Sequence, residues 1–333
     1  MKETQQNVEE AESKASVQII NHEQEICKWP TETFAIDHYH YREDEDDNPN
    51  SDPELEPTMI YPHTVLMFVP GNPGCAGWYI SMLKTIIEKL GRGYSCRAVS
   101  YAGHGTLPHL VRGKRNHLDH ESKNVNMNMN IAWSVDGQVE HKVQWVDMIT
   151  REFVSRRRSS SNKRNSNIHS HSHSHRIPRY IFISHSIGSH LVQRICVLRE
   201  DILLQTQALI HLMPFIRFDP SPKWKGKLLS AFGNMPNLSI PMLKSASRVA
   251  AKVPERVLDA YLEHVAGVGL DEDRKLAKGL MTNHDYTENF LRLGLEEIRD
   301  VPQTPEVSSF VQCNISAISI LYYDVTFVCC MDG

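Results

Sequence analysis

The sequence predicts an α/β protein with a mostly parallel sheet flanked by helices and a helical cap inserted late in the sheet. Three observations lead to this prediction. Apolar runs of strand length alternate with stretches of helical periodicity, as a parallel, doubly wound sheet requires. A serine stands between one such strand and the helix that follows it. Roughly a hundred residues of helical character then precede the last good strand, too many for an ordinary loop.

Composition limits the possible partners and cofactors. The 333 residues are 41% hydrophobic and 23% charged, which is ordinary for a soluble globular protein. A net charge of -4 gives no reason to expect a nucleic-acid partner, which needs a concentrated basic face. The seven cysteines are scattered without a CxxC pair, so we expect neither a metal site nor a disulfide framework, and no cofactor. No signal peptide and no run of about 18 apolar residues occurs, so membrane contact should be peripheral.

The organisation along the chain follows from shifts in composition. Residues 1–25 are polar, and we expect a disordered tail before one domain at 26–333. The Ser/His-rich segment at 155–178 predicts a low-complexity loop. Its alternating histidines could chelate a metal, but composition favours a loop without that function. The helical segment at 215–305 is expected to form the cap.

The individual elements have local signatures. The apolar run Val65–Val69 is bounded by turn residues and predicts a strand buried on both faces. Apolar residues recur at helical spacing over 79–90, and Gly91 should end that helix. By the same criteria we expect strands near 34–39, 96–100, 180–183, 208–213 and 315–323, and helices over 139–153 and 191–202.

The segment Ser184-His185-Ser186-Ile187-Gly188 stands at a predicted strand-to-helix turn. A serine is a poor nucleophile unless a neighbouring base removes its proton, and it must stand clear of the sheet. A sharp turn with small residues two before and two after the serine exposes it in this way. Ser184 and Gly188 fill those places, although Ser184 replaces the usual glycine and should add steric load. The pattern predicts an α/β-hydrolase fold with Ser186 as nucleophile.

A second turn, Gly71-Asn72-Pro73-Gly74, follows the strand at 65–69. Its backbone N–H at Asn72, together with the N–H of Ile187, could form an oxyanion hole, where one donor is typically worth about 3 kcal/mol. The alternative is that both segments are merely tight turns. We expect His185 to be structural. His104 could line the pocket, but it precedes the serine and so stands in the wrong order for the catalytic base.

Further motifs follow one another along the chain. They are Pro70-Gly71-Asn72-Pro73-Gly74, Trp78-Tyr79, the 100–105 segment, Gln138-Val139-Glu140-His141-Lys142, His185-Ser186-Ile187-Gly188 and His211-Leu212-Met213-Pro214. In order and approximate spacing these motifs resemble the lipid droplet-associated hydrolase family over roughly residues 65–323. The resemblance implies a serine hydrolase that acts on lipid esters, or docks peripherally, at neutral-lipid surfaces, and we expect it at the lipid droplet surface, at the endoplasmic reticulum or in the cytosol.

The C-terminal region departs from the family pattern. Asp324 follows the last strand and is our candidate for the acid, with Asp332 a distant second choice. No histidine follows Asp324, so the final helix and strand that should carry the base are missing, and we expect a truncated form with a feeble nucleophile. His264 or His284 in the cap could replace the base only by an unusual geometry.

Three interpretations of function therefore remain open. The first is a serine esterase or lipase acting on lipid esters, with His104, Phe215 and Trp224 contacting the substrate. The second is a non-catalytic protein of the lipid-droplet surface, whose cap segment inserts Phe215 and Trp224 into the monolayer. The third is an esterase for small molecules, which would use the same chemistry and which composition cannot distinguish from the first.

Overall fold

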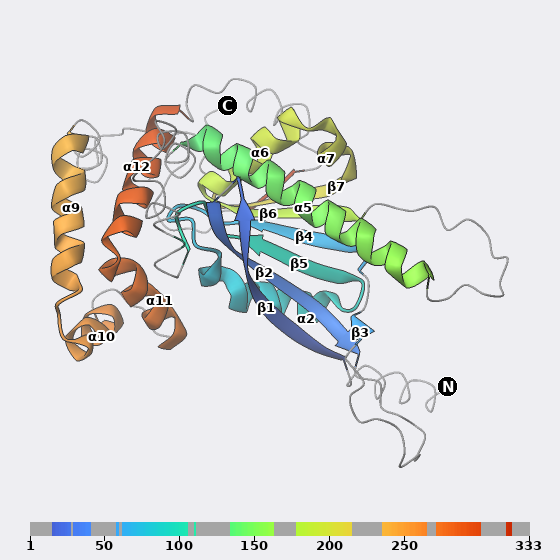
Figure 1. Ribbon diagram of the computed structural model, residues 1–333, viewed down its shortest axis with the longest axis horizontal. Coiled ribbons are helices and arrows are strands. Elements are labelled where there is room, and N and C mark those ends of the chain that lie inside the picture. Colours follow the sequence, from blue (N-terminus) through green and yellow to red (C-terminus); the bar gives the residue numbers. More distant parts are fainter. Residues whose placement is uncertain are drawn as a thin grey trace, which may run out of the picture.

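The computed structural model describes residues 15–27, 29–40, 58–59, 62–105, 110, 134–162, 178–214, 235–264, 271–300 and 318–321. These residues form one eight-stranded sheet with helices on both faces and a separate group of helices at one end (Figure 1). The strands are β1 Ala15–Ile26, β2 Trp29–His40, β3 Thr58–Met59, β4 Thr64–Val69, β5 Tyr94–Val99, β6 Arg179–His185, β7 Thr206–Leu212 and β8 Ile318–Leu321. The helices are η1 Ala76–Tyr79, α2 Ile80–Leu90, α5 Val135–Asn162, α6 Ile187–Leu198, α7 Glu200–Gln205, α9 Pro236–Ala250, α10 Glu255–His264, α11 Asp271–Thr282 and α12 His284–Asp300.

The order of the strands confirms the predicted mostly parallel sheet. They run β1-β2-β5-β4-β6-β7-β8, with β3 attached to β2. All pairs from β5 through β8 are parallel, whereas β1, β2 and β5 pair antiparallel. The expectation of a disordered tail through residue 25 is wrong, because β1 covers 15–26 and pairs along its whole length with β2.

The central strand β4 shows why the core has two halves. Every residue of β4 is buried, as the continuous apolar run predicted. Val65, Met67 and Val69 join the cluster beneath α5 and α6. Leu66 and Phe68 point to the other face and pack in the cluster beneath α2. Because side chains alternate along a strand, one apolar run supplies both layers of the core.

Two helix ends differ in how well the sequence predicted them. Helix α2 ends at Gly91 as expected: the φ of Gly91 is +78°, and its N–H donates to the Ile87 carbonyl over 3.0 Å. Helix α5 continues through Asn162, so the prediction that a loop begins at residue 155 is wrong. The histidine-rich segment lies outside the described residues.

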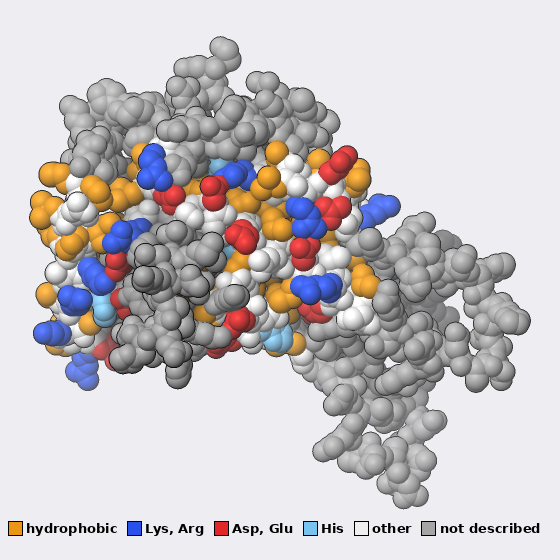
Figure 2. All heavy atoms as spheres, turned by 45° about the horizontal axis from the view of Figure 1, so that its top comes forward, with side chains coloured by type: hydrophobic (Ala, Val, Ile, Leu, Met, Phe, Trp, Pro, Cys, Tyr) orange, Lys and Arg blue, Asp and Glu red, His pale blue; other side chains and the backbone are white. Residues whose placement is uncertain are grey.

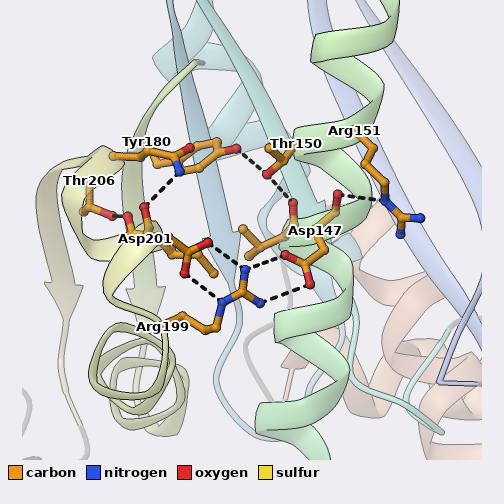
Figure 3. A network of polar contacts seen from close by, with 10 residues as sticks. Asp147, Thr150, Arg151, Tyr180, Arg199, Asp201 and Thr206 are labelled. Carbon is orange, nitrogen blue, oxygen red and sulfur yellow. Dashed lines mark hydrogen bonds and ion pairs between the residues drawn. The ribbon is translucent and has the colours of Figure 1, made fainter. Parts of the chain in front are cut away.

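The predicted helix at 191–202 is in fact two helices that meet at Arg199 (Figure 3). The Arg199 guanidinium donates to both carboxylate oxygens of Asp147 on α5, at 2.9 and 3.1 Å, and to both oxygens of Asp201 on α7, at 2.8 Å each. This pairing lowers the pKa of Asp201 and raises that of Arg199. The residue that interrupts the helix therefore joins three helices.

The cap expected over 215–305 is helical where it is described, and α9, α10, α11 and α12 stand together beside the sheet (Figure 1). Helix α12 packs on both α9 and α5. In the described part of the chain, no helix combines the length and the apolar character needed to cross a bilayer.

Candidate active site

The site lies where β4 and β6 end side by side. Val69, the last residue of β4, pairs with Ser184 near the end of β6. Because the two strands are parallel, the turns that follow them emerge at the same edge of the sheet, the edge where open α/β sheets bind ligands. One turn carries Gly71 and Asn72, and the other carries Ser186.

Ser186 has a strained backbone. It is the single residue between β6 and α6, with φ 50° and ψ −124°. Positive φ is unfavourable for a residue with a side chain, and sparsely populated conformations of this kind cost about 1–3 kcal/mol. The surrounding chain holds it in place: its N–H donates to the Leu212 carbonyl over 3.0 Å, and its carbonyl accepts from the Ser189 N–H over 3.0 Å. Such strain persists where the fold overdetermines it, and it often marks a functional position.

The two predicted turns are in direct contact. A Cβ atom added to Gly71 would lie 2.8 Å from the Cβ of Ser186, so only a glycine leaves room for the serine. A Cβ added to Gly188 would lie 2.6 Å from the Val69 carbonyl oxygen and closer still to that of Pro70. Gly71, which follows β4, and Gly188, in the first turn of α6, thus allow the start of α6 to pack on the end of β4. The sequence-based expectation that the Ser186 corner faces the Asn72 turn is confirmed.

The predicted oxyanion donors lie in suitable elements. Ile187 is the first residue of α6, so its N–H belongs to the first turn, whose N–H groups have no partner within the helix. The partial positive charge at a helix N-terminus favours an anion there. Asn72 directs its side chain elsewhere, because its Nδ2 donates to the Phe290 carbonyl of α12 over 3.1 Å. The backbone N–H of Asn72, and not its side-chain amide, is therefore the candidate donor.

Ser184 has a role beyond the steric load expected of it. Its hydroxyl lies 2.7 Å from Nδ1 of His211 and 3.2 Å from the Ser189 hydroxyl. The other ring nitrogen of His211 lies 3.1 Å from Nε2 of Gln193. Burial lowers the pKa of His211 to about 4, so the ring is neutral and can donate at Nδ1 while accepting at Nε2. This buried network joins β6, β7 and α6 directly beneath Ser186.

His185 is held by a contact with Tyr79. The Tyr79 hydroxyl lies 3.0 Å from Nδ1 of His185. Burial lowers the pKa of His185 and raises that of Tyr79 to about 12, so the hydroxyl donates to a neutral ring. Gly71 packs against this ring, because a Cβ there would lie 2.6 Å from the same nitrogen. The arrangement supports the structural role expected for His185.

His104 is not where the sequence suggested. We expected it to line a pocket, but no part of it is exposed. Its Nδ1 lies 2.8 Å from the Ala102 carbonyl, and its ring packs edge-on against Tyr101 and Tyr286. Burial lowers the pKa of His104 to about 4. Helix α12 covers the residue, so in this structure it cannot touch a substrate.

Sequence reasoning missed the contact between α12 and the site. Tyr286 donates its hydroxyl to the Pro73 carbonyl over 2.8 Å, and Asn289 donates its amide to the Gly103 carbonyl over 2.8 Å. A Cβ on Gly294 would lie 3.1 Å from Nδ2 of Asn72. The same helix face carries Glu297, whose pKa burial raises well above its ordinary value. The available signal was the 3–4 residue spacing of these positions, which places polar groups on a buried face.

Several predicted residues cannot be placed. Asp324 lies outside the described residues, as do Asp332, Phe215 and Trp224. Within the described chain, no histidine hydrogen-bonds the Ser186 hydroxyl, and His264 and His284 belong to cap helices.

A cavity of about 660 Å³ lies elsewhere, between the outer strands and α5, and contains no residue of this site. Its lining includes Phe34, Arg97, Trp145 and Glu152.

Comparisons with known proteins show the family of this chain. Residues 62–325 match the family model of the lipid-droplet associated hydrolases. A lipid droplet-associated hydrolase from Gallus gallus is 27% identical over 170 residues, covering 51% of this chain and 42% of the relative, so the chain spans less than half of that protein.

Solved structures also resemble this one at low identity. A haloalkane dehalogenase loop variant from Bradyrhizobium elkanii is 10% identical, with a TM-score of 0.47 and coverage of 92% of this chain and 89% of that chain. An epoxide hydrolase solved without ligand is 12% identical, with a TM-score of 0.43 and coverage of 84% and 75%. The fold assignment rests on the parallel sheet, the strand-to-helix turn at Ser186 and the family match over most of the sequence. The chain has the α/β-hydrolase fold and belongs to the lipid-droplet associated hydrolase family.

Proposed function

We propose that the protein is a serine hydrolase that cleaves carboxylic esters of lipids, with Ser186 as its nucleophile. The observation that carries the proposal is the strained backbone of Ser186 at a strand-to-helix turn, in contact with Gly71. A nucleophile elbow has this geometry, because the turn lifts the hydroxyl away from the sheet. A structural serine would gain nothing from a conformation that costs about 1–3 kcal/mol.

The chemistry follows from the positions of the groups. The Ser186 hydroxyl attacks the ester carbonyl, and the backbone N–H groups of Asn72 and Ile187 stabilise the negative oxygen that develops. The alcohol leaves, and water then releases the acid from the acyl-serine. Asp324 is the proposed acid of the triad.

A lipid substrate is supported by the family and by the name of the chicken relative. An enzyme that meets its substrate at a lipid surface needs an apolar face close to its site. The cap provides such a face on α9 and α10, next to α12, which contacts the Asn72 turn. Apolar side chains exposed there would bring the site close to a lipid surface.

A fluorophosphonate probe that reacts only with activated serines tests the nucleophile. We expect the full chain to be labelled and Ser186→Ala to be unlabelled, while Ser81→Ala, which changes an exposed serine on α2, keeps the label. Hydrolysis of acyl esters of increasing chain length then tests the substrate class. Equal labelling of wild type and Ser186→Ala would contradict the proposal, as would a complete lack of labelling of the wild type.

A second candidate function is binding to a lipid surface without catalysis. The observation that favours it is a row of exposed apolar side chains on α9 and α10, seen as hydrophobic atoms gathered at the left margin of Figure 2. Leu238, Met242 and Val249 lie on one face of α9 and are 63%, 54% and 64% exposed. Amphipathic helices bind monolayers through such faces, with basic residues at the rim. Arg248 and Lys252 are exposed beside them.

Flotation with phospholipid-coated triacylglycerol droplets separates the two candidates. We expect Leu238→Ser with Met242→Ser to reduce flotation severalfold. Leu204→Ser is the matched control, because Leu204 is 80% exposed but lies on α7, away from the cap. If a protein that floats is never labelled at Ser186, surface binding alone is the function. If the control variant loses flotation equally, the α9 face is not the contact.

A further inference from the structure

Tyr101 holds both ends of the turn that contains the proposed oxyanion donor. Its hydroxyl donates to the Pro70 carbonyl over 2.6 Å, and its backbone N–H donates to the Gly74 carbonyl over 2.7 Å. The ring packs against the turn as well, because a Cβ added to Gly74 would lie 2.7 Å from Cδ2 of Tyr101. Asn72 stands between these two anchor points, so one buried residue spans the turn that places its backbone N–H.

The backbone around Tyr101 is fixed in turn by the start of α5. The Gln138 amide N–H donates to the Ala102 carbonyl over 3.2 Å, and the amide oxygen accepts from the Ala102 N–H over 3.2 Å. Lys142, one helical turn later, donates to the Ser100 carbonyl over 3.2 Å, and its Nζ lies 4.5 Å from the centre of the Tyr101 ring. One helix therefore holds the residue before Tyr101, the residue after it and the ring itself.

The contacts of Lys142 use all three protons of an ammonium group. Besides the carbonyl just named, Nζ lies 3.4 Å from Oε1 of Gln138 and 2.9 Å from Nδ1 of His141. Thr31 sets the tautomer of His141: its hydroxyl donates to the Trp29 carbonyl, so its oxygen accepts from Nε2 of the ring over 2.8 Å. Nδ1 is then bare and accepts from Lys142. Burial lowers the pKa of Lys142 well below its ordinary value, and the three acceptors and the ring face oppose this effect.

We propose that Tyr101 is a positioning residue that clamps the turn at residues 70–74, and that Lys142 and Gln138 keep this clamp in place. The inference rests on the proposed function, since it concerns the turn expected to stabilise the oxyanion. It also gives a role to the motif at residues 138–142, which the proposed mechanism does not otherwise use. Tyr101 and Lys142 are 1% and 0% exposed, so neither touches a substrate and any effect on the rate passes through the turn.

The size of the effect follows from how an oxyanion hole works. Preorganised donors help because they are in place before negative charge develops, and removing one typically slows the reaction about 100- to 1,000-fold. Tyr101→Phe would remove the hydrogen bond to Pro70 but keep the ring and the bond to Gly74, so the turn is loosened and not lost. We therefore expect a smaller effect on the rate, about tenfold.

The rate of fluorophosphonate labelling tests the clamp. Tyr101→Phe should react about tenfold more slowly at saturating probe, while the half-saturating probe concentration stays within about twofold of wild type, because the turn acts on the reacting oxygen and not on probe binding. Tyr180→Phe is the matched control. Tyr180 is also buried, but its hydroxyl lies 2.7 Å from that of Thr150, at the opposite end of β6 from Ser186 (Figure 3). The control should react within about twofold of wild type.

Lys142→Met tests the support from α5. It keeps the length of the side chain and removes all three donors, so we expect labelling about as slow as in Tyr101→Phe. Combining the two changes should slow labelling little further, because both release the same turn. Arg151→Met, which changes an exposed basic residue of the same helix, should react at the wild-type rate. Effects that multiply in the double variant would overturn the role of Lys142.

Amide hydrogen exchange separates this inference from the proposed function. The Gly74 N–H donates to the Gly71 carbonyl within the turn, and its exchange should be about tenfold faster in Tyr101→Phe but unchanged in Tyr180→Phe. If wild type is never labelled, the proposed nucleophile is wrong, and the exchange rate still decides whether Tyr101 holds the turn. If Tyr101→Phe leaves both labelling and exchange at wild-type rates, or if Tyr180→Phe slows labelling equally, this inference is wrong. If Lys142→Met does not fold, the two tyrosine variants still give a result.

Discussion

Changing Gly188 to alanine should destabilise the protein, and the structure gives the size of the effect. The new Cβ would lie 2.6 Å from the Val69 carbonyl oxygen, about 0.8 Å nearer than ordinary van der Waals contact, and it would be even closer to the Pro70 oxygen. Neither oxygen can retreat easily, because Val69 ends a strand paired on both sides and Pro70 accepts from the Tyr101 hydroxyl over 2.6 Å. Overpacking of this kind costs about 3 kcal/mol.

Gly279 provides the matched control. It lies inside α11, and a Cβ there would meet nothing within 4 Å. Alanine is favoured over glycine in a helix interior by about 1 kcal/mol, so Gly279→Ala should stabilise the protein by that amount. The same substitution, made in two helices, should therefore change the free energy of unfolding in opposite directions, with a difference of about 4 kcal/mol.

Urea unfolding followed by circular dichroism measures both variants against wild type. The midpoint should fall for Gly188→Ala and rise slightly for Gly279→Ala. The fluorophosphonate label should also be reduced in Gly188→Ala at low urea, because α6 must shift and carries the Ile187 donor with it. If Gly188→Ala unfolds at or above the wild-type midpoint, the close packing of α6 on the end of β4 is refuted.

Three further predictions concern strain, charge and pH. Ser186→Gly should raise the free energy of unfolding by about 1 kcal/mol in urea titrations, because glycine accepts the positive φ, whereas Ser186→Ala should show no such gain. Burial lowers the pKa values of His104, His190 and His211 to about 4, so the unfolded chain binds protons there below pH 6.5 while the folded chain does not. Stability should therefore be full above pH 6.5 and fall by about 2 kcal/mol per histidine by pH 5 in urea titrations, and a flat profile would contradict the assignment. Arg199→Ala should lower stability by about 1 kcal/mol in low salt and by less in high salt, and an equal loss in both would show that its ion pairs contribute little.

The sequence predicted the parts of the fold that local patterns encode. The apolar runs at β4 and β6 and the helical spacing of α2 are properties of short segments, and each lies where expected. The meeting of Ser186 with the Asn72 turn was also predictable, because adjacent parallel strands bring their carboxyl ends together. The elements and contacts that depend on distant partners were harder to infer.

The missed features depend on residues far apart in the sequence. Strand β1 contains Asn21, His22 and Glu23 in a polar stretch, and it is a strand because β2 supplies backbone hydrogen bonds along its length. Helix α5 extends into a Ser- and Arg-rich segment that composition alone assigns to a loop. The burial of His104 and Glu297 follows from the docking of α12. The spacing along α12 indicates a buried polar face but does not indicate what that face packs against. Strand propensity depends on such tertiary context more than on the residues themselves.

The position of the outer hairpin affects how the domain can be isolated. The segment that matches the family begins at residue 62, whereas the sheet begins at residue 15. A version cut at residue 62 would lose β1 and β2 and leave β5 as the free edge, although Ser95 to Val99 are all buried in the intact protein. An exposed sheet edge invites pairing between molecules, and Arg97 on β5 would also lose its ion-pair partner Asp37 on β2. The N-terminal hairpin therefore covers the edge of β5. The shortest fragment that stays monomeric should be longer than the region that matches the family.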